Sequence, residues 1–100
     1  MVAHLMPAYR SHKQVKACRI VEVQGERLVL STAPVGKSKA VDHPFITWPT
    51  TEEWRWRHRD ELKPGAYLVV YDDGYTSVSP KEAFEKGYDL IFDPHHTSAA

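Results

Sequence analysis

The sequence predicts an α+β fold: a small, mostly antiparallel sheet of four to five short strands with one or two helices. Two observations carry this prediction. Residues 15–32 hold two apolar runs around a short turn, which is typical of a β-hairpin. Residues 63–91 give turn, strand, tight turn, strand and capped-helix signals in close succession. One hundred residues leave room for one modest hydrophobic core around these elements.

The charges of the chain balance, with thirteen basic and thirteen acidic residues. This balance argues against a chain that wraps duplex nucleic acid, where a basic excess is usual. Cys18 is the only cysteine, which excludes an intrachain disulfide. The sequence shows neither the apolar stretch of a signal peptide nor a run long enough to span a bilayer. We therefore expect a soluble protein that works in a reducing cytoplasm and does not contact the membrane.

A single domain is expected over residues 1–100, with an ordered core over about residues 9–92. Residues 1–8 precede the first periodic segment, and residues 93–100 lack an apolar anchor. Both segments are expected to be flexible.

The first strand is predicted over residues 15–23, where β-branched side chains are frequent. Arg19 interrupts the alternation of this strand. Four apolar residues share one parity in it: Val15, Ala17, Val21 and Val23. Gln24-Gly25-Glu26 is a short turn, and residues 27–32 are the partner strand. The next segment, residues 33–40, has the composition of a loop, and Phe45-Ile46 can form a short strand before Pro49.

Residues 50–62 have two interpretations. As a helix, Thr50 is the N-cap, Glu53 at N3 completes a capping box, and Glu53 also pairs with Arg57. Three side chains then stack on one helical face: Trp54, His58 and Leu62. As a strand, the segment places its tryptophans on one side and its arginines on the other. The capping box favours the helix.

The C-terminal third has clearer signals. Pro64-Gly65 fits the centre of a type II turn, and Asp72-Asp73-Gly74 fits a tight connection between strands at 67–71 and 75–78. A helix follows, with three N-terminal signals and one C-terminal signal: Ser79 as N-cap, Pro80 at N1, Glu82 in a capping box, and Gly87 at the end. Its inward face is predicted to hold Ala83, Phe84 and Tyr88.

The tyrosines of this region gather around the predicted hairpin. Tyr67 and Tyr71 share parity with Val69, so one face of that strand is aromatic. Core packing is the simpler interpretation, and a surface that stacks on a small ligand is the alternative.

The strongest candidate for binding is the run of tryptophans and arginines before this region. Its residues are Trp54, Arg55, Trp56, Arg57, His58 and Arg59. Such residues anchor protein interfaces, and they also stack on bases and contact phosphates in single-stranded nucleic acid. A second basic patch is predicted at Arg10, His12 and Lys13.

The sequence contains no recognisable motif for catalysis or metal binding. The six histidines are scattered and accompany a single cysteine, so no zinc-binding spacing exists. We expect no metal, no cofactor and no catalytic residues, and therefore a protein that is not an enzyme.

Two segments together resemble small phage and prophage proteins of uncharacterised function. The N-terminal part of the pattern is Tyr9-Arg10, Val15 and Ala17. The C-terminal part is Pro64-Gly65, Tyr67, Val69, Asp73-Gly74-Tyr75, Ser79-Pro80, Phe84-Glu85 and Tyr88. The similarity covers roughly residues 9–23 and 63–91 and leaves out the Trp/Arg run. It implies a phage accessory protein expressed inside the bacterium, and it brings no catalytic residues.

The function expected from the sequence is therefore binding without catalysis. The leading hypothesis is a phage or prophage accessory protein that binds a host or phage macromolecule, with a host-defence inhibitor as one version. One alternative is a module for single-stranded nucleic acid that uses the Trp/Arg run. The other is a domain that binds a small ligand.

Overall fold

A computed structural model describes residues 3–10, 14–34 and 43–94 of the chain. The described elements are a 3₁₀ helix (Ala3–Leu5), β1 (Ala8–Arg10), β2 (Gln14–Gln24), β3 (Arg27–Ser31), β4 (Phe45–Pro49), α1 (Glu52–Arg57), β5 (Tyr67–Val70), β6 (Thr76–Ser79), α2 (Lys81–Gly87) and β7 (Asp89–Phe92). The predicted α+β class is confirmed. The sheet is larger than expected, because it has seven strands where four to five were predicted.

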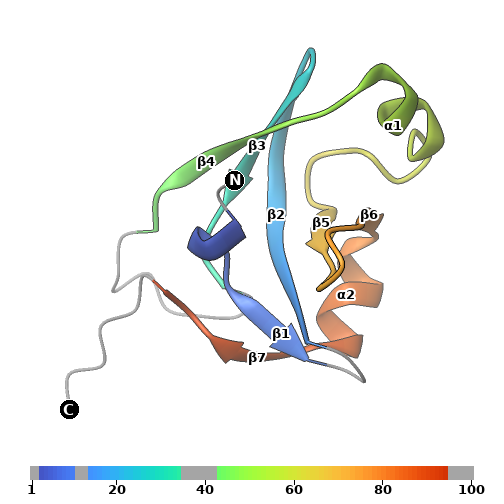
Figure 1. Ribbon diagram of the computed structural model, residues 1–100. Coiled ribbons are helices and arrows are strands. Elements are labelled where there is room, and N and C mark those ends of the chain that lie inside the picture. The colour runs from blue at the N-terminus through green and yellow to red at the C-terminus, as the bar shows by residue number, and fades with distance from the viewer. Residues whose placement is uncertain (1–2, 11–13, 35–42, 95–100) are drawn as a thin grey trace.

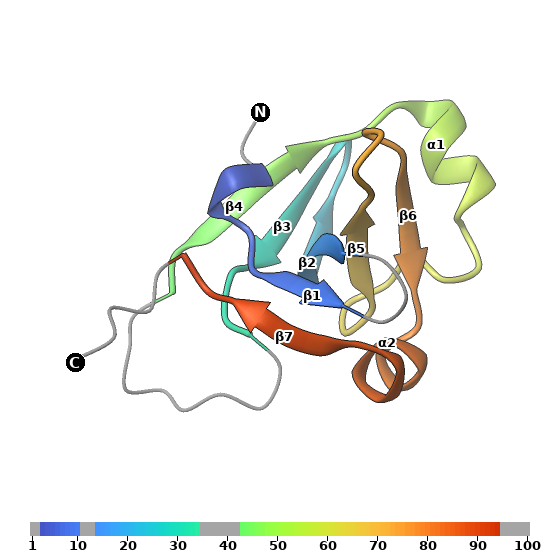
Figure 2. The ribbon, with the colours of Figure 1, turned by 60° about the horizontal axis from the view of Figure 1, so that its bottom comes forward.

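The seven strands form one curled half-barrel (Figures 1 and 2). Their order is β4-β3-β2-β1-β7, and β5 leaves this path by pairing with β2 and β6. Every pairing among the described strands is antiparallel. Figure 2 shows β4, β3, β2, β5 and β6 spread as a fan, with β1 and β7 crossing below it.

Strand β2 is the centre of this arrangement, because it pairs with three other strands. Lys16 lies opposite Ala8 of β1 and also opposite Val70 of β5. Further along, Arg19 lies opposite Ser31 of β3 while still pairing with β5. One edge of β2 therefore changes partner from β1 to β3, and the other edge holds β5. This change of partner curls the sheet.

A β-bulge explains the imperfect alternation of β2. The register with β3 shifts between Ile20 and Glu22, so Val21 has no partner of its own. An extra residue reverses the side to which later side chains point. Val23 therefore packs with Ile20 against the same core, although the two have opposite parity. The expectation that Val15 and Val23 share one face is wrong for this reason.

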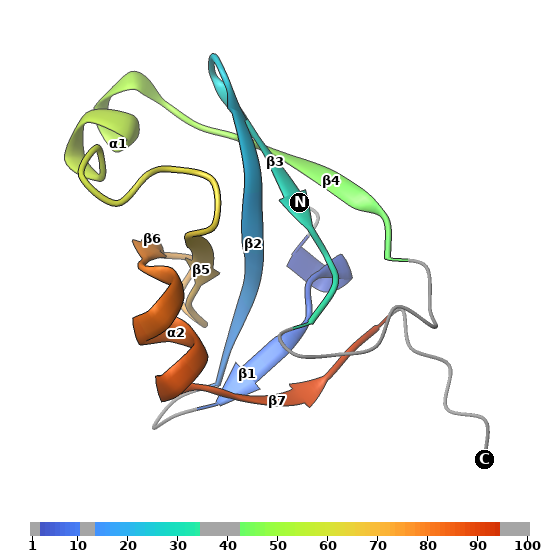
Figure 3. The same ribbon diagram turned by 180° about the vertical axis from the view of Figure 1, so that it is seen from behind.

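Two hydrophobic clusters lie on opposite faces of the sheet. Strand β5 contributes to both, since Leu68 and Val70 face one cluster while Tyr67 and Val69 face the other. The first cluster fills the concave side and contains Met6, Cys18, Ile20, Leu28, Leu30, Trp48, Ala66, Leu68, Val70 and Val78. The second lies under α2 and contains Tyr9, Val15, Ala17, Tyr67, Val69 and Phe84. Figure 3 shows α2 beside β5 and β6 on this face.

The N-terminal residues differ from the sequence-based expectation of a loose segment over 1–8. Residues 3–5 form the 3₁₀ helix, and Met6 and Ala8 are buried. Strand β1 then lies between β2 and β7, and it places Tyr9 opposite Leu90. At the other end, Asp93 bonds to His43 at 2.6 Å, which joins the end of β7 to the start of β4. Residues 95–100 and residues 35–40 of the loop predicted over 33–40 lie outside the described residues.

The two predicted turns at glycine are confirmed. Gly65 has φ of +98°, and the Ala66 amide donates to the Lys63 carbonyl at 3.1 Å, as a type II turn requires. Gly74 has φ of +89° and ends the connection between β5 and β6, where its amide donates to the Tyr71 carbonyl.

Both helix caps differ from the predictions. The N-cap of α1 is Thr51, one residue later than predicted, and its hydroxyl accepts from the Trp54 amide at 3.1 Å. That register places Trp54 at N3, so the predicted capping box with Glu53 does not form. In α2 the N-cap is Pro80, without a side-chain bond, and the Ser79 hydroxyl points to the Pro80 carbonyl at 3.4 Å.

The inward face of α2 is narrower than predicted. Phe84 is its only buried residue, and Ala83 is exposed. Neither described helix is long and apolar enough to cross a membrane.

Candidate interaction surface on helix α1

Helix α1 lies beyond the last residues of β4, at one end of the sheet (Figure 1). The helix interpretation of residues 50–62 is confirmed for residues 52–57, and residues 58–61 form a turn. Its start is held from two directions. The Thr51 hydroxyl caps it, and the Thr50 hydroxyl donates to the Glu26 carbonyl at 2.7 Å. The helix is therefore fixed to the β2–β3 turn.

Trp54 faces the protein. Its ring packs against the first cluster, and its Nε1 donates to the Thr76 carbonyl of β6 at 3.4 Å. The His58 ring lies 4.7 Å from the Trp54 ring, centroid to centroid, and Leu62 packs on the same cluster. The predicted contact of Trp54 with His58 is therefore confirmed, whereas Leu62 lies beyond the end of α1 and does not share a helical face with them. This contact anchors α1.

Trp56 faces solvent, as expected for a residue on the opposite side of the helix. Its side chain is 67% exposed, the largest exposure among the large hydrophobic residues described. The Arg59 guanidinium lies over the indole, 4.0 Å from its centroid, and the Arg59 side chain also donates to the Trp56 carbonyl at 2.7 Å. The cation–π contact leaves the rest of the ring accessible.

The other two arginines of the run are engaged locally. Arg55 donates to the Thr50 hydroxyl at 2.8 Å, and Arg57 forms the predicted pair with Glu53 at 2.7 Å. Within residues 52–61, three arginines accompany four acidic residues. The surface of α1 therefore has no basic excess.

His58 ends α1 and is nearly buried. Its Nε2 has no hydrogen-bond partner among the residues that the structure describes. Burial lowers the pKa of His58 from its ordinary value of 6.5, and the neighbouring Arg57 lowers it further, whereas Glu61 raises it. The neutral imidazole is therefore the form that the folded protein favours.

This burial predicts a pH dependence of stability. As the pH falls through 6.5, the unfolded chain binds a proton at His58 before the folded protein does, so the free energy of unfolding decreases. In His58→Phe the ring remains but the titration is lost. Urea unfolding at pH 7.5 and 5.0 should show that wild type loses more stability than His58→Phe. An equal loss in both proteins would contradict the prediction.

The second predicted patch does not join this surface. Arg10 is exposed on β1, where it lies opposite Gln14 and Asp89. Figures 1 and 3 place β1 at the end of the molecule away from α1. His12 and Lys13 lie outside the described residues.

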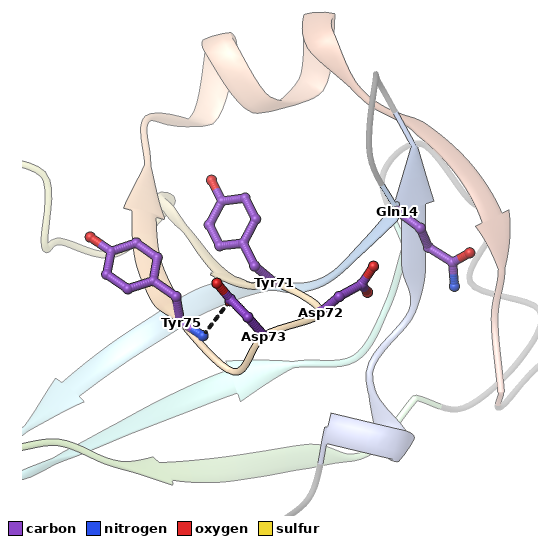
Figure 4. Close-up of a pocket in the computed structure, with 5 residues that line it drawn as sticks. All are labelled: Gln14, Tyr71, Asp72, Asp73 and Tyr75. Carbon is purple, nitrogen blue, oxygen red and sulfur yellow. Dashed lines mark hydrogen bonds between the residues drawn. The ribbon is translucent and has the colours of Figure 1, made fainter.

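A cavity of about 520 Å³ opens beside the β5–β6 turn (Figure 4). Its lining residues are Gln14, Tyr71, Asp72, Asp73 and Tyr75. The aromatic face of the hairpin was visible in the sequence, but the two aspartates carried only a turn signal. Nothing in the sequence pattern pointed to Gln14, which reaches the cavity through the pairing of β2 with β5.

In the part of the chain that the structure describes, no group of three or more histidine, cysteine, aspartate or glutamate side chains could hold a metal ion. Burial raises the pKa of Cys18 to about 12, so its thiol stays protonated at neutral pH and is a poor nucleophile.

Comparison with known proteins adds no relative: no family model, curated protein or solved structure matches this chain. Its function is therefore inferred from its own residues and their geometry.

Proposed function

We propose that this chain is a non-enzymatic binding domain that contacts a protein partner through Trp56 on α1. The exposure of Trp56 carries this proposal. Exposure of a large aromatic side chain to water is unfavourable, and burial of that side chain against a partner would stabilise the complex. Tryptophan and arginine are also the residue types that dominate binding energy at protein interfaces.

The support around Trp56 suits an interface. Trp54 fixes the helix to the first cluster, and Arg59 holds the indole from one side. A side chain that is already ordered loses little conformational entropy when the partner binds. Trp56 with Arg59 is therefore a pre-organised contact.

The charge pattern favours a protein partner over single-stranded nucleic acid. Binding of nucleic acid needs cations that are free to neutralise phosphates. Here Arg57 pairs with Glu53, Arg55 bonds to Thr50, and Glu52 and Asp60 are exposed nearby. These contacts and acids weaken attraction for a phosphate backbone.

The resemblance to phage and prophage proteins suggests where the partner is found. It supports a phage accessory role inside the bacterial cytoplasm, with a host or phage protein as the partner. A component of host defence is one specific version of this proposal.

The test compares two exposed aromatic residues on different elements. Tagged wild type, Trp56→Ala and Phe45→Ala are used to capture proteins from a bacterial lysate, since Phe45 is exposed to a similar degree on β4. A protein captured by wild type and Phe45→Ala, and lost with Trp56→Ala, supports the proposal. Capture that does not depend on Trp56 contradicts it.

A second measurement separates the nucleic-acid alternative. Fluorescence anisotropy with a labelled oligothymidylate at low and high salt should show no binding by the wild-type protein. Salt-sensitive binding that Trp56→Ala and Arg57→Ala both weaken would favour nucleic acid instead.

A further inference from the structure

The cavity at the β5–β6 turn has a chemistry that the α1 surface does not share. Its lining combines two tyrosine rings, two carboxylates and one amide, and none of the described lining residues is basic. Figure 4 shows Tyr71 and Tyr75 side by side with their hydroxyls pointing the same way, while Asp72 lies between Tyr71 and Gln14. The two tyrosine rings therefore form an aromatic wall of the cavity, and the two carboxylates lie next to it.

The aromatic wall is held by the second hydrophobic cluster. The rings of Tyr71 and Tyr75 are 5.8 Å apart at an angle of 32°. Tyr71 packs against the second cluster together with Tyr88, which follows α2 and stacks on the fully buried Phe84 at 4.6 Å. This packing on the second cluster orders the Tyr71 ring before any ligand binds.

The two carboxylates have different roles. Asp73 accepts a hydrogen bond from the Tyr75 amide at 2.9 Å, which fixes the turn. Asp72 makes no hydrogen bond or ion pair with any residue in the described ranges, and it is exposed. Asp72 is therefore available to bind a ligand. The turn that Asp73 fixes determines where Asp72 lies.

This combination suits a flat organic cation. A guanidinium stacks on a tyrosine ring through cation–π attraction, and its planar fork donates two parallel hydrogen bonds to one carboxylate. Gln14 lines the same cavity beyond Asp72 (Figure 4). A compact ammonium would use the charge of Asp72 but not the flat surface of Tyr71.

We propose that this cavity binds the guanidinium of an arginine side chain presented by a protein segment. Tyr71 provides the stacking surface, Asp72 accepts the charged hydrogen bonds, and Gln14 completes the rim. The proposal goes beyond the role of Trp56, because it uses none of the α1 surface residues.

The probe is the capped pentapeptide Gly-Gly-Arg-Gly-Gly, added to ¹⁵N-labelled full-length protein while backbone amide resonances are followed by NMR. Resonances of Gln14 and residues 71–75 should shift and saturate in the millimolar range. The same peptide with citrulline, which is neutral and nearly isosteric, should cause no such shifts. A lysine peptide should bind more weakly than the arginine peptide.

Variants distinguish specific binding in the cavity from non-specific attraction between opposite charges. Asp72→Asn should weaken binding of the arginine peptide by about tenfold or more, because it removes a charge-assisted pair of bonds. Asp60→Asn removes the same charge in the turn that follows α1, outside the cavity, and should leave binding unchanged. Trp56→Ala should also leave it unchanged, so this proposal and the proposed function fail separately.

Three outcomes would overturn the proposal. Equal shifts with the citrulline peptide would remove the role of charge, and equal affinity for the lysine peptide would remove the role of the guanidinium plane. Shifts that Asp60→Asn reduces as much as Asp72→Asn would show non-specific attraction. The amide spectrum of each variant outside residues 71–75 reports whether its fold is intact.

Discussion

Phe84→Ala is expected to lower the free energy of unfolding by about 3–5 kcal/mol. Phe84 is fully buried and is the centre of the second cluster. Its ring stacks on Tyr67 at 4.4 Å and on Tyr88 at 4.6 Å, and it meets the edge of Tyr9 at 4.8 Å. Alanine would leave a cavity between α2 and the sheet. Because small domains are stable by only about 5–15 kcal/mol, the loss would be a large share of the total.

The measurement is urea denaturation followed by circular dichroism, with Phe45→Ala as the control. Phe45 loses the same atoms from a side chain that is 65% exposed, so its cost should stay within about 0.5 kcal/mol. Similar costs for the two variants would contradict the assignment of Phe84 to a packed core.

Gly74→Val is expected to cost about 2–3 kcal/mol through backbone strain alone. Gly74 has φ of +89°, a conformation that β-branched residues strongly avoid. A Cβ atom added there would meet no atom within 4 Å apart from its chain neighbours, so the expected cost comes from the local backbone conformation. The strain would be relieved only by moving the β5–β6 turn.

Gly87→Val is the matched control for this substitution. Gly87 also has free space around the added Cβ atom, but its φ is not in the positive region. The same change should therefore cost little there. Thermal unfolding of both variants checks the difference, and equal melting temperatures would contradict the role of the backbone conformation. If the turn moves, Gly74→Val should also lose binding of the arginine peptide.

The sequence predicted the elements whose signals are local. The hairpin of β2 and β3, the turns at Gly65 and Gly74, and helix α1 depend on neighbouring residues and were found. Although strands β5 and β6 are of similar length and were found, strands β1 and β7 were missed. They exist because Tyr9 and Leu90 pair across almost the whole chain. A distant pairing of this kind leaves no periodic pattern in either segment.

The candidate sites likewise combine features that the sequence shows with features that arise only from the fold. The opposite directions of Trp54 and Trp56 follow from the helical repeat, and the sequence showed them. The cavity depends on Gln14, which is far along the chain from Asp72, and this proximity arises from sheet topology. The prediction of Ser79 as the N-cap of α2 is wrong for a local reason, since the first helical hydrogen bond of α2 is accepted by the Pro80 carbonyl. The helix therefore starts one residue later than the Ser-Pro pair suggests.

The central position of β2 has a consequence for synthesis on the ribosome. The β2–β3 hairpin closes over a short distance and can form as soon as it leaves the exit tunnel. Strand β1 pairs early with β2, but its outer edge has no partner until β7 is made. An open edge recruits other chains, so aggregation of the nascent protein should be most frequent just before residue 89 emerges. Co-translational chaperones would protect the chain most in that interval.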